Sequence, residues 1–372
     1  MGTIFLCVNS DIGRGNTIGF RFGKIASELK KKHKKVHIIA RANYSELEVC
    51  IPWYKNILGR VLNAIRIYIF PSLHYRPLEI YLFDRFVLQQ LKKEKYLYTV
   101  AHFGEGLPKS IEYLKKKGVQ IYLDMPMGYD GYTKYLRKKG IHVGNGNQDV
   151  LTSLTQAIEL SDVIVVPSVF VKETVKNAGF TNKDYALVPF GANNVKKYIE
   201  KKQNKKVKFL FAGNVNYRKG ILYLLQAWRK AGFQDAELHI CGRVYKEIQE
   251  EIKKYTVGNI FFHGFVDLKE YFIDADIFVF PSLLEGSAKV VYEAMSYSLP
   301  VITTDNSGSI VEDGKHGYIV PIADVNSLVE KMKYLYNHED IRIKLGIAAN
   351  KHVQKFTWEH YGEQVIELYT KE

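Results

Sequence analysis

The sequence has few cysteines and no long uninterrupted apolar segment. Its 372 residues include only Cys7, Cys50 and Cys241, which lie too far apart for a disulfide framework or a thiolate metal motif. No stretch of 18 or more uncharged apolar residues is present, which argues against a membrane-spanning helix. The first ten residues lack a basic segment followed by an apolar core, so we expect no signal peptide. These absences predict a globular protein of the reducing cytosol.

Acidic residues are scarce relative to basic ones. Lysine and arginine number 53 against 39 aspartates and glutamates, which gives a net charge of +14. The excess is concentrated before Phe190, where 28 basic residues face 16 acidic ones, whereas 25 face 23 after it. An uneven charge of this kind indicates that one half faces an anionic partner, either phospholipid headgroups, an acidic glycan or nucleic acid.

Short apolar runs alternate with longer helical stretches along the whole chain, which is typical of an α/β fold with parallel sheets. The polar, lysine-rich segment 191–206 interrupts this pattern and predicts a linker. We therefore expect a first domain over 1–190 and a second over 207–356, each doubly wound. Two such domains face each other across a cleft, and their ligands bind beyond the carboxyl ends of the strands.

Two glutamates near the predicted cleft carry the most chemical information. Glu285 directly follows a predicted strand, and Glu293 lies about two turns along the next helix. At 100° per residue the eight-residue spacing lets both carboxylates face one site. Carboxylates accept hydrogen bonds from sugar hydroxyls, and the free N–H groups at the start of the helix suit anionic or hydroxyl-rich ligands. Two ordinary surface glutamates would show the same spacing.

The surrounding sequence, EG-x6-EAM-x4-PVI from Glu285 onward, resembles the retaining GT-B glycosyltransferases of family 4. The similarity extends upstream through Phe211–Gly220 and His263–Asp267, and is strong from about Ala157 onward. The resemblance implies a GT-B fold, with two Rossmann-like domains facing across a cleft. It also implies that residues from about 357 to 372 form a helix that crosses back to the first domain.

The resemblance assigns roles within the second domain. Glu293 is expected to hold the ribose hydroxyls of a nucleotide-sugar donor, and Glu285 to lie beside the sugar ring. Arg218 and Lys219 are expected to neutralise the diphosphate, on which negative charge grows as the glycosidic bond breaks. Both cations would otherwise be read as solvated turn residues. The segment expected to contact the sugar and phosphates comprises Gly286, Ser287, Ala288 and Lys289.

The first domain is expected to contribute a glycine-rich turn and polar side chains, again by resemblance. Gly13 and Gly15 fit the turn, where glycine lets the backbone approach a ligand closely. His102 ends a predicted strand, and Asp124 begins a loop at another such position. Both are predicted catalytic residues, although a histidine at the end of a strand also fits a structural, hydrogen-bonded role.

No metal and no other cofactor is predicted, because the nucleotide-sugar is a co-substrate. Asp274 and Asp276 form a D-x-D pair that matches the metal motif of a different glycosyltransferase fold. Here the pair lies between a predicted helix and strand. No His or Cys cluster has the spacing of metal ligands.

Segment 57–70 reads as an amphipathic helix with Arg60 and Arg66 on its polar side. Together with the lysine-rich runs of the first half, it favours contact with an anionic membrane surface. A helix that packs its apolar face on its own sheet explains the same pattern, so both interpretations stay open.

The leading hypothesis is a retaining glycosyltransferase that transfers a sugar to a glycan or lipid-linked acceptor of the bacterial cell envelope. It is expected in the cytoplasm, where the membrane interpretation above would place it on the inner face of the cell membrane. One alternative is a nucleotide-sugar epimerase with the same two-domain plan. Another is a basic nucleic-acid-binding protein, which is disfavoured because no recognition signature is present and the charge is spread.

Overall fold

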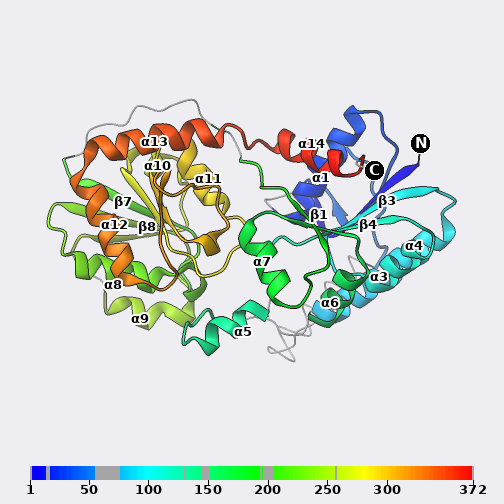
Figure 1. Ribbon diagram of the computed structural model, residues 1–372, viewed down its shortest axis with the longest axis horizontal. Coiled ribbons are helices and arrows are strands. Elements are labelled where there is room, and N and C mark those ends of the chain that lie inside the picture. The colour runs from blue at the N-terminus through cyan, green and yellow to red at the C-terminus, as the bar shows by residue number, and fades with distance from the viewer. Residues whose placement is uncertain are drawn as a thin grey trace.

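The computed structural model describes residues 2–13, 17–54, 76–129, 131–144, 151–192, 195, 205–255 and 258–370. They form two parallel six-stranded sheets, with the strand orders β2-β1-β3-β4-β5-β6 and β12-β11-β10-β7-β8-β9. Figure 1 shows each sheet in its own lobe with helices around it. The predicted α/β class with two doubly wound sheets is confirmed. Most of the predicted linker 191–206 and all of segment 57–70 lie outside the described residues.

The first sheet is built from strands that read as nearly continuous apolar runs, as expected where helices cover both faces. In the first of them, all residues except Asp11 are buried. Its strands are β1 (Thr3–Ile12), β2 (Val36–Asn43), β3 (Tyr98–Phe103), β4 (Gln120–Asp124), β5 (Val163–Val166) and β6 (Asp184–Leu187). Its helices are α1 (Ile18–Lys31), α3 (Arg76–Lys93), α4 (Pro108–Lys115), α5 (Gly131–Lys138), α6 (Leu151–Leu160) and α7 (Val169–Asn177).

The second sheet repeats the plan with shorter strands. They are β7 (Val207–Ala212), β8 (Ala236–Cys241), β9 (Ile260–Gly264), β10 (Ile277–Phe280), β11 (Val301–Thr303) and β12 (Gly317–Ile319). The helices are α8 (Ile221–Ala231), α9 (Gln249–Lys253), α10 (Lys269–Asp274), α11 (Lys289–Ser296), α12 (Val325–Asn337) and α13 (Glu339–Val353). No helix of the described parts is both long enough and apolar enough to cross a bilayer.

The final helix, α14 (Trp358–Leu368), leaves the second lobe and packs against α1 of the first. In Figure 1 it is the red helix beside the blue α1. Trp358, Tyr361 and Val365 share one apolar core with residues of β1 and α1. The predicted return of this helix to the first domain is therefore confirmed.

The two lobes touch through the loops that follow β4 and β10. A Cβ atom added to Gly286 would lie 1.6 Å from the carbonyl oxygen of Pro126, so only glycine permits this approach. The Ser168 hydroxyl donates to the carbonyl of Gly286 at 2.6 Å. Farther along the interface, Leu136 and Val143 from the segment around α5 pack against Leu283. The carboxyl ends of both sheets thus meet at one interface.

Candidate active site

Glu285 lies just past the carboxyl end of β10 and is the centre of a charged cluster. Its Oε1 atom is 2.8 Å from Nη1 of Arg218 and 2.5 Å from Nζ of Lys219. The Ser282 hydroxyl donates to the same oxygen at 3.1 Å. The turn after β7 therefore supplies two cations to one carboxylate from the turn after β10. The cluster keeps a net positive charge beside the domain interface.

The local backbone explains how the two cations reach this position. Residues Tyr217–Lys219 form one turn of 3₁₀ helix, capped by the side chain of Asn216, which accepts from the Lys219 amide. Gly220 follows with φ +69°, and a Cβ atom there would lie 1.9 Å from the carbonyl oxygen of Pro281. Glycine is thus required for the turn to pack against β10 and to direct Lys219 at Glu285.

Lys219 is largely desolvated. Burial lowers the pKa of its ammonium group, and the neighbouring Arg218 lowers it further, whereas Glu285 opposes both effects. The Nζ atom also lies 5.0 Å from the centre of the Phe280 ring. Lys219 shares its one carboxylate with Arg218, and such a buried cation favours the binding of a further anion. Each added negative group lowers the free-energy cost of keeping the ammonium charge out of water.

Helix α11 carries the second glutamate. Its N-terminus, at Ala288, has no side-chain cap, so N–H groups remain for a ligand. Burial raises the pKa of Glu293, and Lys289 one turn earlier lowers it. Burial also lowers the pKa of Lys289 to about 8, with Arg21 adding to the effect and Glu293 opposing it.

Lys289 points toward the first domain. Its Nζ atom lies 5.1 Å from the centre of the Trp358 ring on α14 and 5.9 Å from that of Phe20 on α1.

Of the two predicted turn glycines, Gly13 follows β1 at the carboxyl edge of the first sheet, and Gly15 lies outside the described residues. Gly286 contacts the first domain directly, and the Ser287 hydroxyl bonds that of Tyr292 at 2.7 Å. The predicted donor segment thus lies at the interface of the domains.

Solved structures with the same arrangement decide the fold. Sucrose-phosphate synthase from Thermosynechococcus elongatus superposes with a TM-score of 0.73 over 99% of this chain and 98% of its own, at 18% identity. Anabaena Alr3699/HepE, solved with UDP and glucose, superposes with a TM-score of 0.64 over 99% of each chain, at 12% identity. The chain has the GT-B fold. The resemblance to GT-B glycosyltransferases stated from the sequence is confirmed.

Sequence comparison finds similarity to glycosyltransferases. Residues 206–338 match the family described as glycosyl transferases group 1. The capsular polysaccharide biosynthesis glycosyltransferase CapM of Staphylococcus aureus is 26% identical over 92% of this chain and 91% of its own length. The matched residues 206–338 include Arg218, Lys219 and Glu285, which form the Glu285 cluster.

Two other relatives match over shorter parts. An uncharacterized 41.2 kDa protein in the cps region of Klebsiella pneumoniae is 33% identical over 35% of this chain. The uncharacterized glycosyltransferase MJ1178 of Methanocaldococcus jannaschii is 30% identical over 54% of it. The chain spans 37% and 56%, respectively, of the lengths of these relatives.

His102 and Asp124 are both buried and each contacts a side chain from another part of the chain. His102 is completely buried, its Nδ1 is 2.6 Å from the Tyr369 hydroxyl, and burial lowers its pKa to about 3. Asp124 accepts from Nη2 of Arg21 at 2.6 Å, and both side chains are buried. These contacts hold α1 and the α14 region against the first sheet. Their predicted catalytic roles gain no support from this placement, and neither residue enters the mechanism below.

Two interface residues were missed from the sequence. Ser168 donates to Gly286, 118 positions later in the chain, and no local pattern announces such a contact. Arg21 is a buried cation on the apolar side of α1, in the same stripe as Phe22 and Ile25. A charged residue within an apolar stripe is a signal that sequence reasoning can use, because a buried charge requires a partner.

Two groups of potential metal ligands among the described residues fit an ion poorly. Glu312, His316 and His352 offer ligand atoms within 4.8 Å of one another. The Glu312 amide donates to Nδ1 of His316 at 3.2 Å, so the neutral imidazole carries its proton on Nε2 and has no lone pair left for an ion. In the D-x-D pair, Asp274 binds Nζ of Lys208, and Asp276 accepts from the Lys208 amide. The two aspartates therefore hold Lys208 near the start of β7.

Proposed function

We propose that this chain is a retaining glycosyltransferase that moves a sugar from a nucleotide-sugar donor to a glycan or lipid-linked acceptor of bacterial envelope polysaccharide, such as capsule, O-antigen or lipopolysaccharide. The match of residues 206–338 to group 1 glycosyl transferases and the similarity to a capsular glycosyltransferase support the reaction class. The observation that carries the proposal is the cluster in which Glu285 holds Arg218 and Lys219 beside the free N-terminus of α11.

The cluster accounts for donor binding and activation. Arg218 and Lys219 bind the diphosphate. The diphosphate then neutralises part of the positive charge that Glu285 neutralises in the free protein. Negative charge grows on the leaving phosphate as the glycosidic bond breaks, so fixed cations and the α11 N-terminus stabilise the transition state more than the ground state. Glu293 accepts hydrogen bonds from the ribose, and Glu285 contacts the sugar. Because the cations already neutralise the diphosphate, we propose that transfer needs no metal ion.

The domain assignment belongs to the same proposal. Residues 1–190 with about 357–372 form the acceptor-binding domain, and residues 207–356 form the donor-binding domain, with 191–206 as the linker. The contact of Gly286 with Pro126 supports a site shared by both domains, because the donor segment touches the first domain there.

The test is release of nucleoside diphosphate from a panel of nucleotide-sugars, with EDTA present and absent. We expect Lys219→Met and Glu293→Gln to lose most of the activity. The matched controls Lys253→Met and Glu250→Gln alter an exposed ion pair of the same domain and should keep it. Unchanged turnover in the first two variants would remove the site assignment. Conversion of a free nucleotide-sugar without an acceptor would support an epimerase instead.

We also propose that the cytoplasmic enzyme binds an anionic membrane surface through the amino ends of the first sheet, opposite the cleft. Lysines precede β2 and the neighbouring strands β3 and β4 there, and Leu97 just before β3 is 79% exposed. These lysines are Lys34 and Lys35 before β2, Lys92, Lys93 and Lys95 before β3, and Lys115, Lys116 and Lys117 before β4. Each adds roughly 1 kcal/mol of attraction near such a surface.

Vesicle flotation tests this surface. Binding to phosphatidylglycerol vesicles, but not to phosphatidylcholine vesicles, should fall with salt and be lost on changing Lys92, Lys93 and Lys95 to glutamate. The same change at Lys246, Lys253 and Lys254 of the second domain is the control. Salt-sensitive binding to DNA with no binding to vesicles would contradict the proposal.

A further inference from the structure

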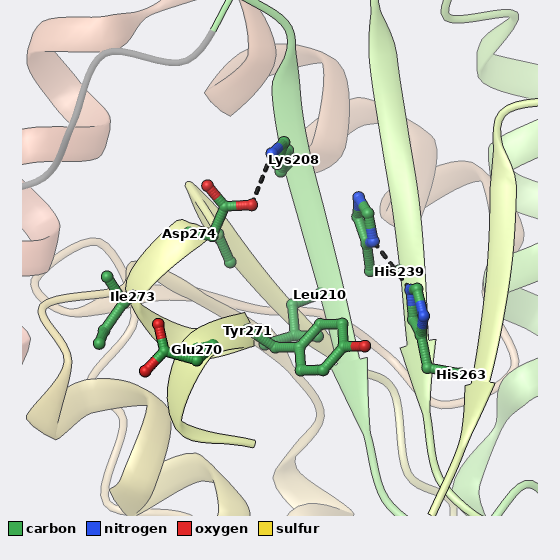
Figure 2. A pocket seen from close by; sticks show the side chains of 9 residues that line it. Lys208, Leu210, His239, His263, Glu270, Tyr271, Ile273 and Asp274 are labelled. Atoms are coloured by element: carbon green, nitrogen blue, oxygen red, sulfur yellow. Dashed lines mark hydrogen bonds and ion pairs between the residues drawn. The ribbon is translucent and has the colours of Figure 1, made fainter. Parts of the chain in front are cut away.

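A pocket of about 340 Å³ opens on the second sheet, on the face that α10 partly covers. It is separate from the Glu285 cluster and plays no part in the proposed transfer. Figure 2 shows two histidines from adjacent strands directed at one another on its floor, with Tyr271 of α10 beside them. The side chains that matter here are His239, His263, Tyr271, Lys208 and Asp274.

The two imidazoles are unusually close. Nδ1 of His239 on β8 lies 3.0 Å from Nε2 of His263 on β9, and the ring planes differ by 6°. The register of β8 and β9 shifts at this point, because His239 pairs with Phe261 whereas Cys241 pairs with Gly264. His263 is thus the additional residue of a bulge, a device that redirects a side chain.

The neighbouring carboxylate fixes the protons. Oε2 of Glu237 is 3.3 Å from Nε2 of His239. An ionised carboxylate only accepts, so the neutral His239 ring carries its proton on Nε2 and presents the Nδ1 lone pair to His263. The space between the rings therefore holds one proton, which His263 donates.

We propose that His239 and His263 bind a divalent transition-metal ion of the zinc type, which takes the place of that shared proton. Zinc–nitrogen bonds of about 2.0–2.1 Å in a tetrahedral site place two ligand nitrogens roughly 3.3 Å apart, close to the separation seen here. On binding, the proton of His263 moves from Nε2 to Nδ1, so the ring frees its Nε2 lone pair for the ion and releases no proton. The open pocket leaves room for water as the remaining ligands.

Two further features favour an ion at this pair. Metal-bound histidines commonly donate their second ring proton to a carboxylate, and Glu237 already occupies that position behind His239. Lys208, which also lines the pocket, is held by Asp274 at 2.5 Å. The cluster of Glu312, His316 and His352 lacks this arrangement, because an amide occupies Nδ1 of His316.

The ion would join the edge strand β9 to β8. It binds only the folded chain, because the two histidines are 24 residues apart and come together through the sheet. Such binding raises the melting temperature as the metal concentration rises. The inference is independent of the transferase reaction, and its test needs no substrate.

The experiment uses the full-length protein stripped with a chelator and titrated with zinc chloride against a chromophoric competitor. We expect one zinc ion per chain and a higher melting temperature with zinc. His263→Gln should weaken binding at least tenfold, and Glu237→Gln by roughly 10–100-fold because it keeps both rings but removes the carboxylate behind them. His360→Gln, which alters an exposed histidine near Glu363, is the matched control and should bind like the unmodified protein.

The proposal is overturned if the protein binds no zinc, if His263→Gln binds it as tightly as the unmodified protein, or if His352→Gln rather than His263→Gln abolishes binding. Should His263→Gln fail to fold, anomalous diffraction from zinc-soaked crystals of the unmodified protein decides the matter. A peak between the two ring nitrogens supports the site, and a peak only elsewhere, or none, rejects it.

Discussion

The substitution Glu285→Gln distinguishes the contribution of the Glu285 cluster to folding stability from its contribution to ligand binding. Glu285→Gln keeps the shape of the side chain but leaves Arg218 and Lys219 around a neutral amide. Removing one partner of a buried ion pair costs about 3–5 kcal/mol. Arg218 is 29% exposed, and the amide oxygen still accepts a hydrogen bond, so we expect a loss of ~2–3 kcal/mol in the free energy of unfolding.

Ligand binding should change in the opposite direction. Without the carboxylate, the two cations no longer share their charge with Glu285, so UDP or GDP should bind about tenfold tighter, which corresponds to ~1.4 kcal/mol. Sugar transfer should nevertheless fall, because the contact between Glu285 and the donor sugar is lost. A saturating nucleoside diphosphate should therefore restore part of the lost stability.

Urea unfolding, calorimetric titration with UDP and GDP, and turnover together measure these effects. Glu250→Gln is the matched control, since Glu250 forms an exposed pair with Lys253 that is worth about 0–1 kcal/mol. If Glu285→Gln leaves the unfolding free energy unchanged and weakens the binding of both diphosphates, the reasoning about this cluster is refuted.

Three other substitutions test the interface and the buried charges. Gly286→Ala places a Cβ atom against the carbonyl of Pro126, so the domains must separate there and turnover should fall by about 10²-fold, with little effect on the melting temperature. Asp124→Asn leaves Arg21 buried without its anion and should lower the unfolding free energy by ~3–5 kcal/mol in urea. The pKa of Lys289 falls from 10.5 to about 8 on folding, so between these values the unfolded chain binds more protons and stability rises with pH, a rise that Lys289→Met should remove.

Each of these has a matched control. Gly258→Ala adds a Cβ atom with no neighbour within 4 Å, and equal activity losses in both glycine variants would contradict the interface argument. Glu112→Gln removes a surface pair with Lys116, and a cost as large as that of Asp124→Asn would show that burial is not the cause. Lys253→Met should keep the pH dependence of the unmodified protein, and the argument fails if Lys289→Met keeps it as well.

The second half of the molecule was predictable because its signals are local. Glu285 and Glu293 belong to one strand–turn–helix unit, whose regular geometry follows from the spacing in the sequence. That Lys219 meets Glu285 did not follow from spacing, since they are 66 positions apart. The family resemblance assigned both residues to the donor site but did not predict the contact between them. The structure then supplied the contact itself, at 2.5 Å.

The first half was harder to predict for a physical reason. Successive side chains of a strand point to opposite faces, so a histidine at the end of a strand faces either the cleft or the core. What covers His102 is Tyr369, 267 positions later, and no pattern around His102 indicates it. The close approach of His239 and His263 likewise depends on a bulge in β9, which no residue pattern around either histidine announced.

The return of α14 to α1 also sets an order on synthesis. Trp358, Tyr361 and Val365 complete a core whose other walls come from β1 and α1, yet the ribosome makes them after the whole second domain. While the second domain is translated and folds, the apolar groove along α1 of the first domain is therefore still uncovered. A nascent chain arrested before residue 358 should expose that groove and depend on chaperones, although every strand of both sheets has already been made.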